Sequence, residues 1–319
     1  MASPASDRMR AVVVDSKVKG RLAISEVPVP QPAAQQALVR VAAVSLNRGE
    51  VRNAVTEAQD GARIGWDLAG VVARAAADGS GPKAGTRVVG LDPIGGWAEF
   101  AAVLTLTLAP IPDAVSFADA ATLPVAGLTA RHALLRGGEL RGQRVLINGA
   151  SGGVGTFACQ LAHLAGAHVV AAIRDGRQES FVRRLGADAV AIGPNLAAAE
   201  SQGPYHLIVE SVGGSALGAA LGMLAHGGTC VLLGTTESAK TTFDADRFYH
   251  SGGTTLYGLA LAYEFQRELP SVGLTHLAQL VAEGKLKPAI EVTAPWTEIA
   301  DIASSLMERR YSGKAVLTF

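Results

Sequence analysis

A glycine-rich segment from Asn148 to Gly155 constrains the fold of this chain more than any other feature. It follows an aliphatic run at 144–147 and precedes a long apolar stretch that ends near residue 165. Glycine permits the tight turn that joins a buried strand to a helix, and the unpaired N–H groups of a helix N-terminus attract an anion. The segment therefore predicts a strand, a turn and a helix that hold the pyrophosphate of a dinucleotide; a purely structural turn is the alternative.

Runs typical of strands alternate with runs typical of helices after this segment. The predicted strands lie at 168–173, 188–192, 206–209 and 229–233, and the predicted helices at 179–185 and 216–224. This alternation predicts an α/β fold in which helices cover both faces of a doubly wound parallel sheet. One more helix is expected at 273–282, and a final strand at 315–317 can return to the first part of the chain.

The first third of the chain has the pattern of a separate, β-rich domain. Short strand-like runs are separated by glycine-rich turns and lie at 11–14, 37–44, 86–90 and 97–101. Prolines in the segment 27–32 exclude a helix there, because a proline disfavours helical geometry in the residue before it. A length of 319 residues suits two domains.

The charge balance and the cysteine content exclude several classes of protein. Lys and Arg together number 28, as do Asp and Glu, so no overall field attracts nucleic acid or an anionic membrane. Cys159 and Cys230 are too few for a disulfide framework, which indicates a reducing compartment. Residues 1–7 lack the apolar core of a signal peptide, and no apolar run is long enough to span a membrane. We expect a cytoplasmic protein.

The end of the second predicted strand of the α/β part indicates which dinucleotide is bound. At this place a carboxylate accepts a hydrogen bond from the free 2′-hydroxyl of the adenosine ribose, whereas an arginine accommodates a 2′-phosphate. Arg174, Asp175 and Arg177 stand here. A guanidinium can grip a phosphate through paired donors, so the sequence favours NADPH over NADH. A solvated cluster of charges at a strand end is the alternative.

The glycine segment and six further motifs together resemble the zinc-free quinone oxidoreductase branch of the medium-chain dehydrogenase/reductase superfamily. The further motifs are Ser45–Asn47, Gly65–Val72, Ala126–Ala130, Leu185–Asp188, Val212–Gly214 and Ser312–Leu317. The resemblance implies a GroES-like, β-rich catalytic domain made of residues 1–124 and 265–319. It also implies a Rossmann domain at 125–264, with NADPH in the cleft. Relatives commonly dimerise, and the β-branched stretch 254–257 is a candidate edge strand that pairs with its copy in a homodimer.

Residue types indicate that no metal is bound. Catalytic zinc in this superfamily uses Cys with His or Glu from the first domain, yet no cysteine precedes Cys159 and no histidine precedes His132. The segment Gly65–Asp67 stands where zinc-dependent relatives carry Gly-His-Glu. Without a strong Lewis acid the best acceptor is a quinone or an α,β-unsaturated carbonyl, because delocalisation spreads the charge delivered with hydride.

The resemblance and the motifs assign candidate site residues. Asn47 and Thr129 are expected near the nicotinamide and the substrate, with a turn or cap residue and an ordinary helix residue as the respective alternatives. The expected cofactor-binding residues are Ser151, Gly152, Gly153, Val154, Arg174, Arg177, Val212, Gly234 and Gly258. The expected residues of the substrate pocket are Arg48, Arg52, Trp66 and Tyr257.

Several positions depart from the pattern of the family. Arg52 stands where many quinone oxidoreductases carry a pocket tyrosine, Gln178 where they carry a phosphate-binding lysine, and a further tyrosine is replaced around Gly193. An enoyl-thioester reductase therefore stays open, with Arg48 or Arg52 near the phosphates of a carrier arm. A non-catalytic NADPH-binding redox sensor also stays open. A short-chain dehydrogenase is disfavoured because no Tyr-x-x-x-Lys pair follows the glycine segment.

Overall fold

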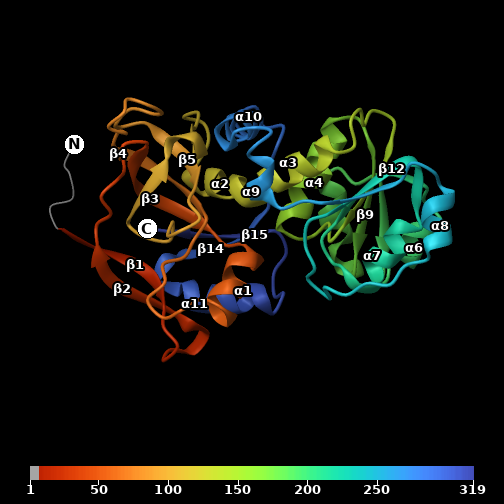
Figure 1. Cartoon of the computed structure of the whole chain (residues 1–319), viewed down its shortest axis with the longest axis horizontal. Helices are drawn as coiled ribbons and strands as arrows, with labels where there is room; N and C mark the ends of the chain where they lie inside the picture. The colour runs from red at the N-terminus through yellow and green to blue at the C-terminus, as the bar shows by residue number, and fades with distance from the viewer. Residues whose placement is uncertain (1–6) are drawn as a thin grey trace. The chain divides into compact units, whose positions relative to one another are not determined.

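The computed structural model describes residues 7–319, which form two compact units (Figure 1). The first unit runs to Leu128 and resumes at Glu268–Phe319, and the second comprises Thr129–Arg267. These breaks fall a few residues after the expected ones at 124 and 264. The interpretation of the first residues as lacking a signal peptide concerns mainly residues 1–6, which lie outside the described part of the chain.

The first unit is built on a seven-stranded sheet and a two-stranded sheet. The large sheet has the order β14-β15-β3-β4-β5-β7, with β6 paired to β3, and β1 pairs with β2. The strands are β1 Arg8–Val14, β2 Leu22–Pro28, β3 Gln36–Ser45, β4 Asp67–Arg74, β5 Arg87–Leu91, β6 Phe100–Leu104, β7 Leu108–Pro110, β14 Ile290–Pro295 and β15 Lys314–Thr318. Because β15 pairs with β3, the predicted return of the final strand is confirmed.

Among the described residues of this unit, four segments are α-helices: α1 Arg48–Thr56, α2 Phe117–Ala121, α10 Pro270–Ala282 and α11 Ile299–Met307. Shorter helical segments are the 3-10 helices η1 Lys19–Arg21, η2 Thr105–Thr107 and η5 Trp296–Glu298, and the π-helix η3 Leu123–Gly127. A core of β-branched and aliphatic side chains includes the fully buried Trp97.

The strand expected at 97–101 begins three residues later than predicted, at Phe100. The backbone of Trp97 is held by a loop instead, since its N–H donates to the carbonyl of Ile64 at 3.2 Å. The indole of Trp97 packs so closely against Gly65 that a Cβ there would lie 2.3 Å from the ring. Its carbonyl accepts from the backbone N–H of Val12 in β1 at 2.9 Å, so contacts with β1 and with the loop around Gly65, and not a place in β6, fix this tryptophan.

The second unit is the predicted parallel sheet. Its order is β10-β9-β8-β11-β12-β13, and every neighbouring pair is parallel. The strands are β8 Arg144–Asn148, β9 His168–Ile173, β10 Ala189–Ile192, β11 Tyr205–Glu210, β12 Leu224–Leu232 and β13 Thr255–Gly258. The helices are α3 Leu128–Leu135, which starts one residue before the unit, α4 Gly153–Leu164, α5 Glu179–Arg184, α6 Ala197–Glu200, α7 Gly214–Leu221, α8 Ala245–His250 and α9 Leu261–Glu264. A 3-10 turn, η4 Gly176–Gln178, precedes α5.

The strand order reverses at β8. The chain proceeds from β8 through β9 to β10 on one side, and from β11 through β12 to β13 on the other. In sheets of this kind ligands bind beyond the carboxyl ends of the strands at such a reversal. The glycine segment begins at the end of β8, so the fold places it at this position.

Two predicted boundaries in this unit differ from the structure by three residues or more: the end of the helix expected at 216–224, and the start of the strand expected at 229–233, which begins at Leu224. The helix expected at 216–224 ends at Leu221, because Gly222 forms its C-cap, and Leu224 already belongs to β12. The two cysteines are buried, and burial raises the pKa of Cys159 to about 12. Within 7–319, no helix has both the length and the apolar character needed to cross a membrane.

Candidate functional site

The glycine segment forms a tight turn between β8 and α4. Gly149 has a φ of +79°, and Gly152 is the N-cap of α4 without any side-chain cap. The first N–H groups of a helix have no partner within the helix, so an uncapped N-terminus offers them to a ligand. The twelve-residue helix α4 therefore presents donors and the positive end of its dipole at the end of β8.

The space around the turn requires glycine at two positions. A Cβ on Gly155 would lie 2.3 Å from the carbonyl oxygen of Gly149 and 2.7 Å from the Cα of Ala150. A Cβ on Gly149 would lie 2.6 Å from the Ser211 hydroxyl oxygen. Gly152 is exposed and has only one atom within 4 Å of such a Cβ, at 3.3 Å, so its outer side is open. These residues fit a pyrophosphate that approaches the backbone closely.

A buried carboxylate holds the end of β11 against the end of β8. Glu210, which is fully buried, accepts hydrogen bonds from Asn148 Nδ2 at 2.7 Å and from the backbone N–H groups of Val212 and Gly213. Burial is the main cause that raises the pKa of this carboxyl. Glu210 was not identified from the sequence. A glutamate at the end of a buried, β-branched run is unusual, however, and could have indicated this residue.

Two arginine–carboxylate pairs lie beyond the end of β9. Arg174 Nη2 lies 3.4 Å from Glu237 Oε2, and both side chains are close to half exposed. Arg177 Nε lies 2.8 Å from a carboxylate oxygen of Asp175, whose pKa the neighbouring arginine lowers. Both candidate phosphate ligands are thus present at the expected strand end, each with a carboxylate partner.

The remaining expected cofactor contacts lie at this same carboxyl edge or next to it. Ser151 donates to Oε1 of Gln178 at 3.0 Å, which ties the glycine segment to η4. Gly234 follows β12, and Gly258 is the last residue of β13 with no atom near its Cβ position. Val212 is only 7% exposed and packs in the core. Whether each of these residues contacts a cofactor stays a prediction.

Tyr257 belongs to a partly buried cluster of polar side chains. Its hydroxyl donates to Glu264 Oε1 at 2.5 Å, and this bond is the main cause of the raised pKa of the tyrosine. Glu264 is 2% exposed and lies 3.4 Å from Arg136 Nη2, whose guanidinium also covers the tyrosine ring. The hydroxyl hydrogen is therefore donated within the second unit, and a role for Tyr257 in a substrate pocket stays a prediction.

In the first unit, Asn47 lies in a network of buried charged side chains. Its Nδ2 donates to Asp67 Oδ2 at 2.7 Å and to Glu50 Oε1 at 2.9 Å, and its Oδ1 accepts from Lys314 Nζ at 2.6 Å. Asn47 is also the N-cap of α1, and its backbone N–H donates to Glu50 at 2.7 Å. Both amide hydrogens are thus used inside the protein. If Asn47 is to donate a hydrogen bond to a substrate, one of these two bonds has to open.

The network contains three titratable side chains that are at most 2% exposed: Glu50, Asp67 and Lys314. Asp67 accepts from the Ser45 hydroxyl at 2.6 Å and lies 3.4 Å from Lys314 Nζ. Burial, and then the Asp67 carboxylate, raises the pKa of Glu50 to about 8, and burial lowers the pKa of Lys314. Asp67 and Lys314 thus form a buried ion pair, beside a Glu50 carboxyl that holds its proton to higher pH than an exposed one does.

Sequence reasoning missed both Glu50 and Lys314 as members of this network. The spacing Asn47-x-x-Glu50 is that of a capping pair at a helix start, so Glu50 had a local signal. Lys314 had none, because 247 residues separate it from Asp67.

The guanidinium of Arg48 is engaged within the first unit, and its expected role in the substrate pocket stays a prediction. Its Nη1 donates to the carbonyls of Leu306 and Met307, both at 3.1 Å, at the end of α11. The last carbonyls of a helix lack partners and favour a cation, which explains this use of the arginine. Arg52 is exposed on α1, and its pocket role stays a prediction.

The remaining candidates are Trp66, which directly precedes β4, and Thr129. The backbone N–H of Trp66 donates to Glu50 Oε2 at 2.6 Å, and its half-buried ring lies beside Gly49. Thr129 lies on α3 and is 6% exposed. Nothing in these positions tests the proposed contacts with nicotinamide or substrate.

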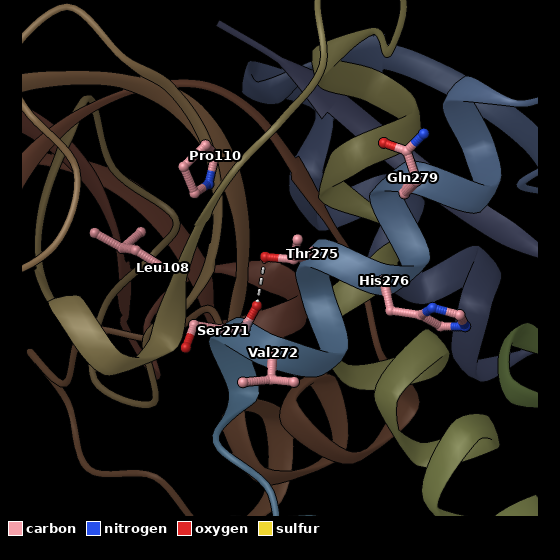
Figure 2. Close-up of a pocket in the computed structure, with 7 residues that line it drawn as sticks. All are labelled: Leu108, Pro110, Ser271, Val272, Thr275, His276 and Gln279. Carbon is pink, nitrogen blue, oxygen red and sulfur yellow. Dashed lines mark hydrogen bonds between the residues drawn. The ribbon is translucent and has the colours of Figure 1, made fainter.

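Figure 2 shows a groove of the first unit that contains none of the expected site residues. Its residues come from β7 on one side and from α10 on the other: Leu108, Pro110, Ser271, Val272, Thr275, His276 and Gln279. The Thr275 hydroxyl donates to the carbonyl of Ser271 at 2.8 Å, so part of its polar lining is satisfied within α10.

Comparison with known proteins identifies the family. The model of the alcohol dehydrogenase GroES-like domain matches residues 33–113, and that of the zinc-binding dehydrogenase domain matches residues 153–275. The chain is 30% identical over 312 residues to the chloroplast envelope quinone oxidoreductase homolog of Arabidopsis thaliana, with 92% of each chain covered. It belongs to the quinone oxidoreductase branch of the medium-chain dehydrogenase/reductase superfamily. Members of this superfamily bind a nicotinamide dinucleotide.

Two further matches show the breadth of this superfamily. The solved structure of the quinone oxidoreductase from Coxiella burnetii has a TM-score of 0.84 and 25% identity, and the match covers 98% of this chain and 99% of that one. A phenolphthiocerol/phthiocerol polyketide synthase subunit of Mycobacterium tuberculosis is 30% identical over 93% of this chain. This chain spans only 14% of the length of that subunit.

Proposed function

We propose that this protein is an NADPH-dependent, zinc-independent oxidoreductase that reduces a quinone or an α,β-unsaturated carbonyl. The observation that carries the proposal is the open, uncapped start of α4 at the strand reversal, with Arg174 at the end of the adjacent strand β9. The similarity to two quinone oxidoreductases supports the reaction class. When bound, the reduced dinucleotide supplies the hydride.

Zinc independence is supported by the chemistry of the side chains near Asn47. Glu50 and Asp67 already accept hydrogen bonds from neutral donors, and Lys314 places a cation 3.4 Å from Asp67. Within 7–319, no three His, Cys, Asp or Glu side chains are grouped so that they could hold a metal ion. These residues do not fit a catalytic zinc site, which needs three protein ligands of this kind.

The proposed acceptor follows from this environment. A simple ketone or alcohol needs strong polarisation, whereas a quinone or enone spreads the incoming charge over a conjugated system. The part played by the chain is then to bind and orient the reactants and to keep water out. An enoyl thioester is the second candidate, favoured by the match to the polyketide synthase subunit.

The function is tested by following the absorbance of NADPH with purified, chelator-treated protein. An ortho-quinone, a simple enone and an enoyl thioester serve as acceptors, and each assay is repeated with NADH. Turnover that survives chelation and is faster with NADPH supports the proposal, and the best acceptor gives the substrate class. Binding of NADPH without turnover of any acceptor supports a redox sensor instead.

We also propose that the protein is a homodimer. β13 is a terminal strand of the six-stranded sheet, and Leu256 in it is 43% exposed. An exposed edge strand offers unpaired backbone groups that a second copy can use.

A further inference from the structure

The ion pair between Arg174 and Glu237 lies where the adenosine end of a dinucleotide is expected. Arg174 directly follows β9, and the backbone N–H of Glu237 donates to the carbonyl of Val212, just beyond β11, at 2.9 Å. β8 lies between β9 and β11 in the sheet. The ion pair therefore crosses the carboxyl end of β8, where the glycine segment begins.

This ion pair is built so that it opens easily. One nitrogen of Arg174 approaches one oxygen of Glu237 at 3.4 Å, and the two side chains are 46% and 44% exposed. Ion pairs of this kind contribute about 0–1 kcal/mol to stability. Arg177, by contrast, is bound more tightly by Asp175, two residues away, so Arg174 is the arginine that a ligand recruits more easily.

Glu237 acts differently on the two dinucleotides. A 2′-phosphate needs the guanidinium of Arg174, and the carboxylate of Glu237 both occupies that guanidinium and repels the phosphate. A 2′-hydroxyl is a hydrogen-bond donor, which a carboxylate at this place can accept. The same side chain thus opposes NADPH and favours NADH.

We propose that Glu237 is a specificity-determining residue, whose carboxylate competes with the 2′-phosphate of NADPH for Arg174 and so limits the preference for NADPH over NADH. The inference rests on the proposed binding of NADPH by this edge of the sheet. It assigns to Glu237 a role that the motif at the end of β9 alone does not indicate, because Glu237 lies 63 residues further along the chain.

The test is the dissociation constant of NADPH and of NADH for the wild type and for Glu237→Gln, measured by calorimetry or by quenching of protein fluorescence. Removing a competing carboxylate should tighten NADPH binding about 3- to 10-fold, which corresponds to about 0.7–1.4 kcal/mol. NADH binding should stay the same or weaken. Adenosine 2′,5′-bisphosphate and AMP, used as probes without nicotinamide, should show the same contrast.

Further variants make the result specific. Glu200→Gln removes the carboxylate of another half-exposed ion pair of the same unit, with Arg247 at 2.7 Å, and should change neither constant by more than about twofold. In an Arg174→Gln background, Glu237→Gln should give a smaller gain in NADPH affinity, because the contested guanidinium is gone. Glu237→Ala repeats the test without a side-chain amide.

The possible outcomes distinguish a failure of the inference about Glu237 from a failure of the proposed function. If Glu237→Gln and Glu237→Ala, both folded, bind NADPH and NADH as the wild type does, the inference is overturned while the proposed function stands. An equal gain with and without Arg174 overturns the competition for the guanidinium. If the wild type binds neither dinucleotide, the proposed function itself fails.

Discussion

The ammonium group of Lys314 balances a carboxylate that has no access to water. Asp67 is fully buried and Lys314 is 2% exposed, with Nζ within 3.4 Å of the carboxylate. The same Nζ also donates to the carbonyl of Leu46 and to Asn47. Removal of one partner of a buried ion pair leaves the other charge uncompensated, which costs more than the ion pair contributes.

Lys314→Met should therefore lower the free energy of unfolding by about 3–5 kcal/mol. Lys285→Met is the matched control, since Lys285 forms an exposed ion pair with Glu283 at 2.8 Å and should cost no more than about 1 kcal/mol. Denaturant unfolding of both variants measures the difference. Similar values for the two would show that the buried ion pair does not stabilise the fold.

Glu50 should give the stability a dependence on pH. Burial raises its pKa from 4.5 to about 8, so between these values the folded state keeps a proton that the unfolded state has released. The stability due to this proton is complete at low pH and is lost as the pH rises through about 8. The Tm of the wild type should thus fall relative to that of Glu50→Gln between about pH 5 and pH 8.5.

Glu283→Gln provides the comparison for this titration. Glu283 is exposed, and its hydrogen bond with Lys285 lowers its pKa, so it has finished titrating below this range. The difference in Tm between this variant and the wild type should be constant over the same pH range. A constant difference for Glu50→Gln as well would mean that Glu50 is ionised in the folded protein at neutral pH.

At the scale of elements, the turn between β8 and α4 depends on close backbone approach. Gly155→Ala should lower the free energy of unfolding by about 1–3 kcal/mol or more, because its Cβ would lie 2.3 Å from the Gly149 carbonyl oxygen and no flexible side chain can yield. It should also weaken dinucleotide binding, since the shifted backbone no longer aims its N–H groups at the pyrophosphate. Thermal unfolding and NADPH titration measure the two effects.

Gly258→Ala is the stability control for this substitution. Gly258 ends another strand of the same sheet, has no atom within 4 Å of its Cβ position and has no positive φ. Its Tm should stay close to that of the wild type. If Gly155→Ala were equally harmless, the glycine at 155 would not be needed for the turn.

The order of elements in the second unit follows from local sequence patterns, whereas several features of the first unit do not. The runs at 144–147 and 168–173 predict β8 and β9 because a buried parallel strand is apolar throughout. The start of β6 was misplaced because Trp97, although strand-like in sequence, is fixed by the loop around Gly65. Contacts such as Glu237 with Arg174 arise only when the sheet assembles, so no local pattern indicates them.

At the scale of the whole molecule, each unit has its own β-structure and its own core. The first core gathers side chains from both ends of the chain, for example Val12 and Leu317, and the second core contains Leu146, Ile208 and Cys230. The final strand β15 is thus an integral part of the first unit, because it pairs with both β3 and β14.

Assembly of two copies is proposed through one edge of the second sheet. β13 and β10 are its two terminal strands, and each exposes one aliphatic side chain to the same extent: Leu256 at 43% and Ile192 at 42%. A lysine on an edge strand opposes pairing with another copy. Leu256→Lys should therefore convert the dimer to a monomer, whereas Ile192→Lys should leave it a dimer. Light scattering after size-exclusion chromatography gives the mass, and a wild type that is monomeric, or a dimer that only Ile192→Lys disrupts, would refute pairing through β13.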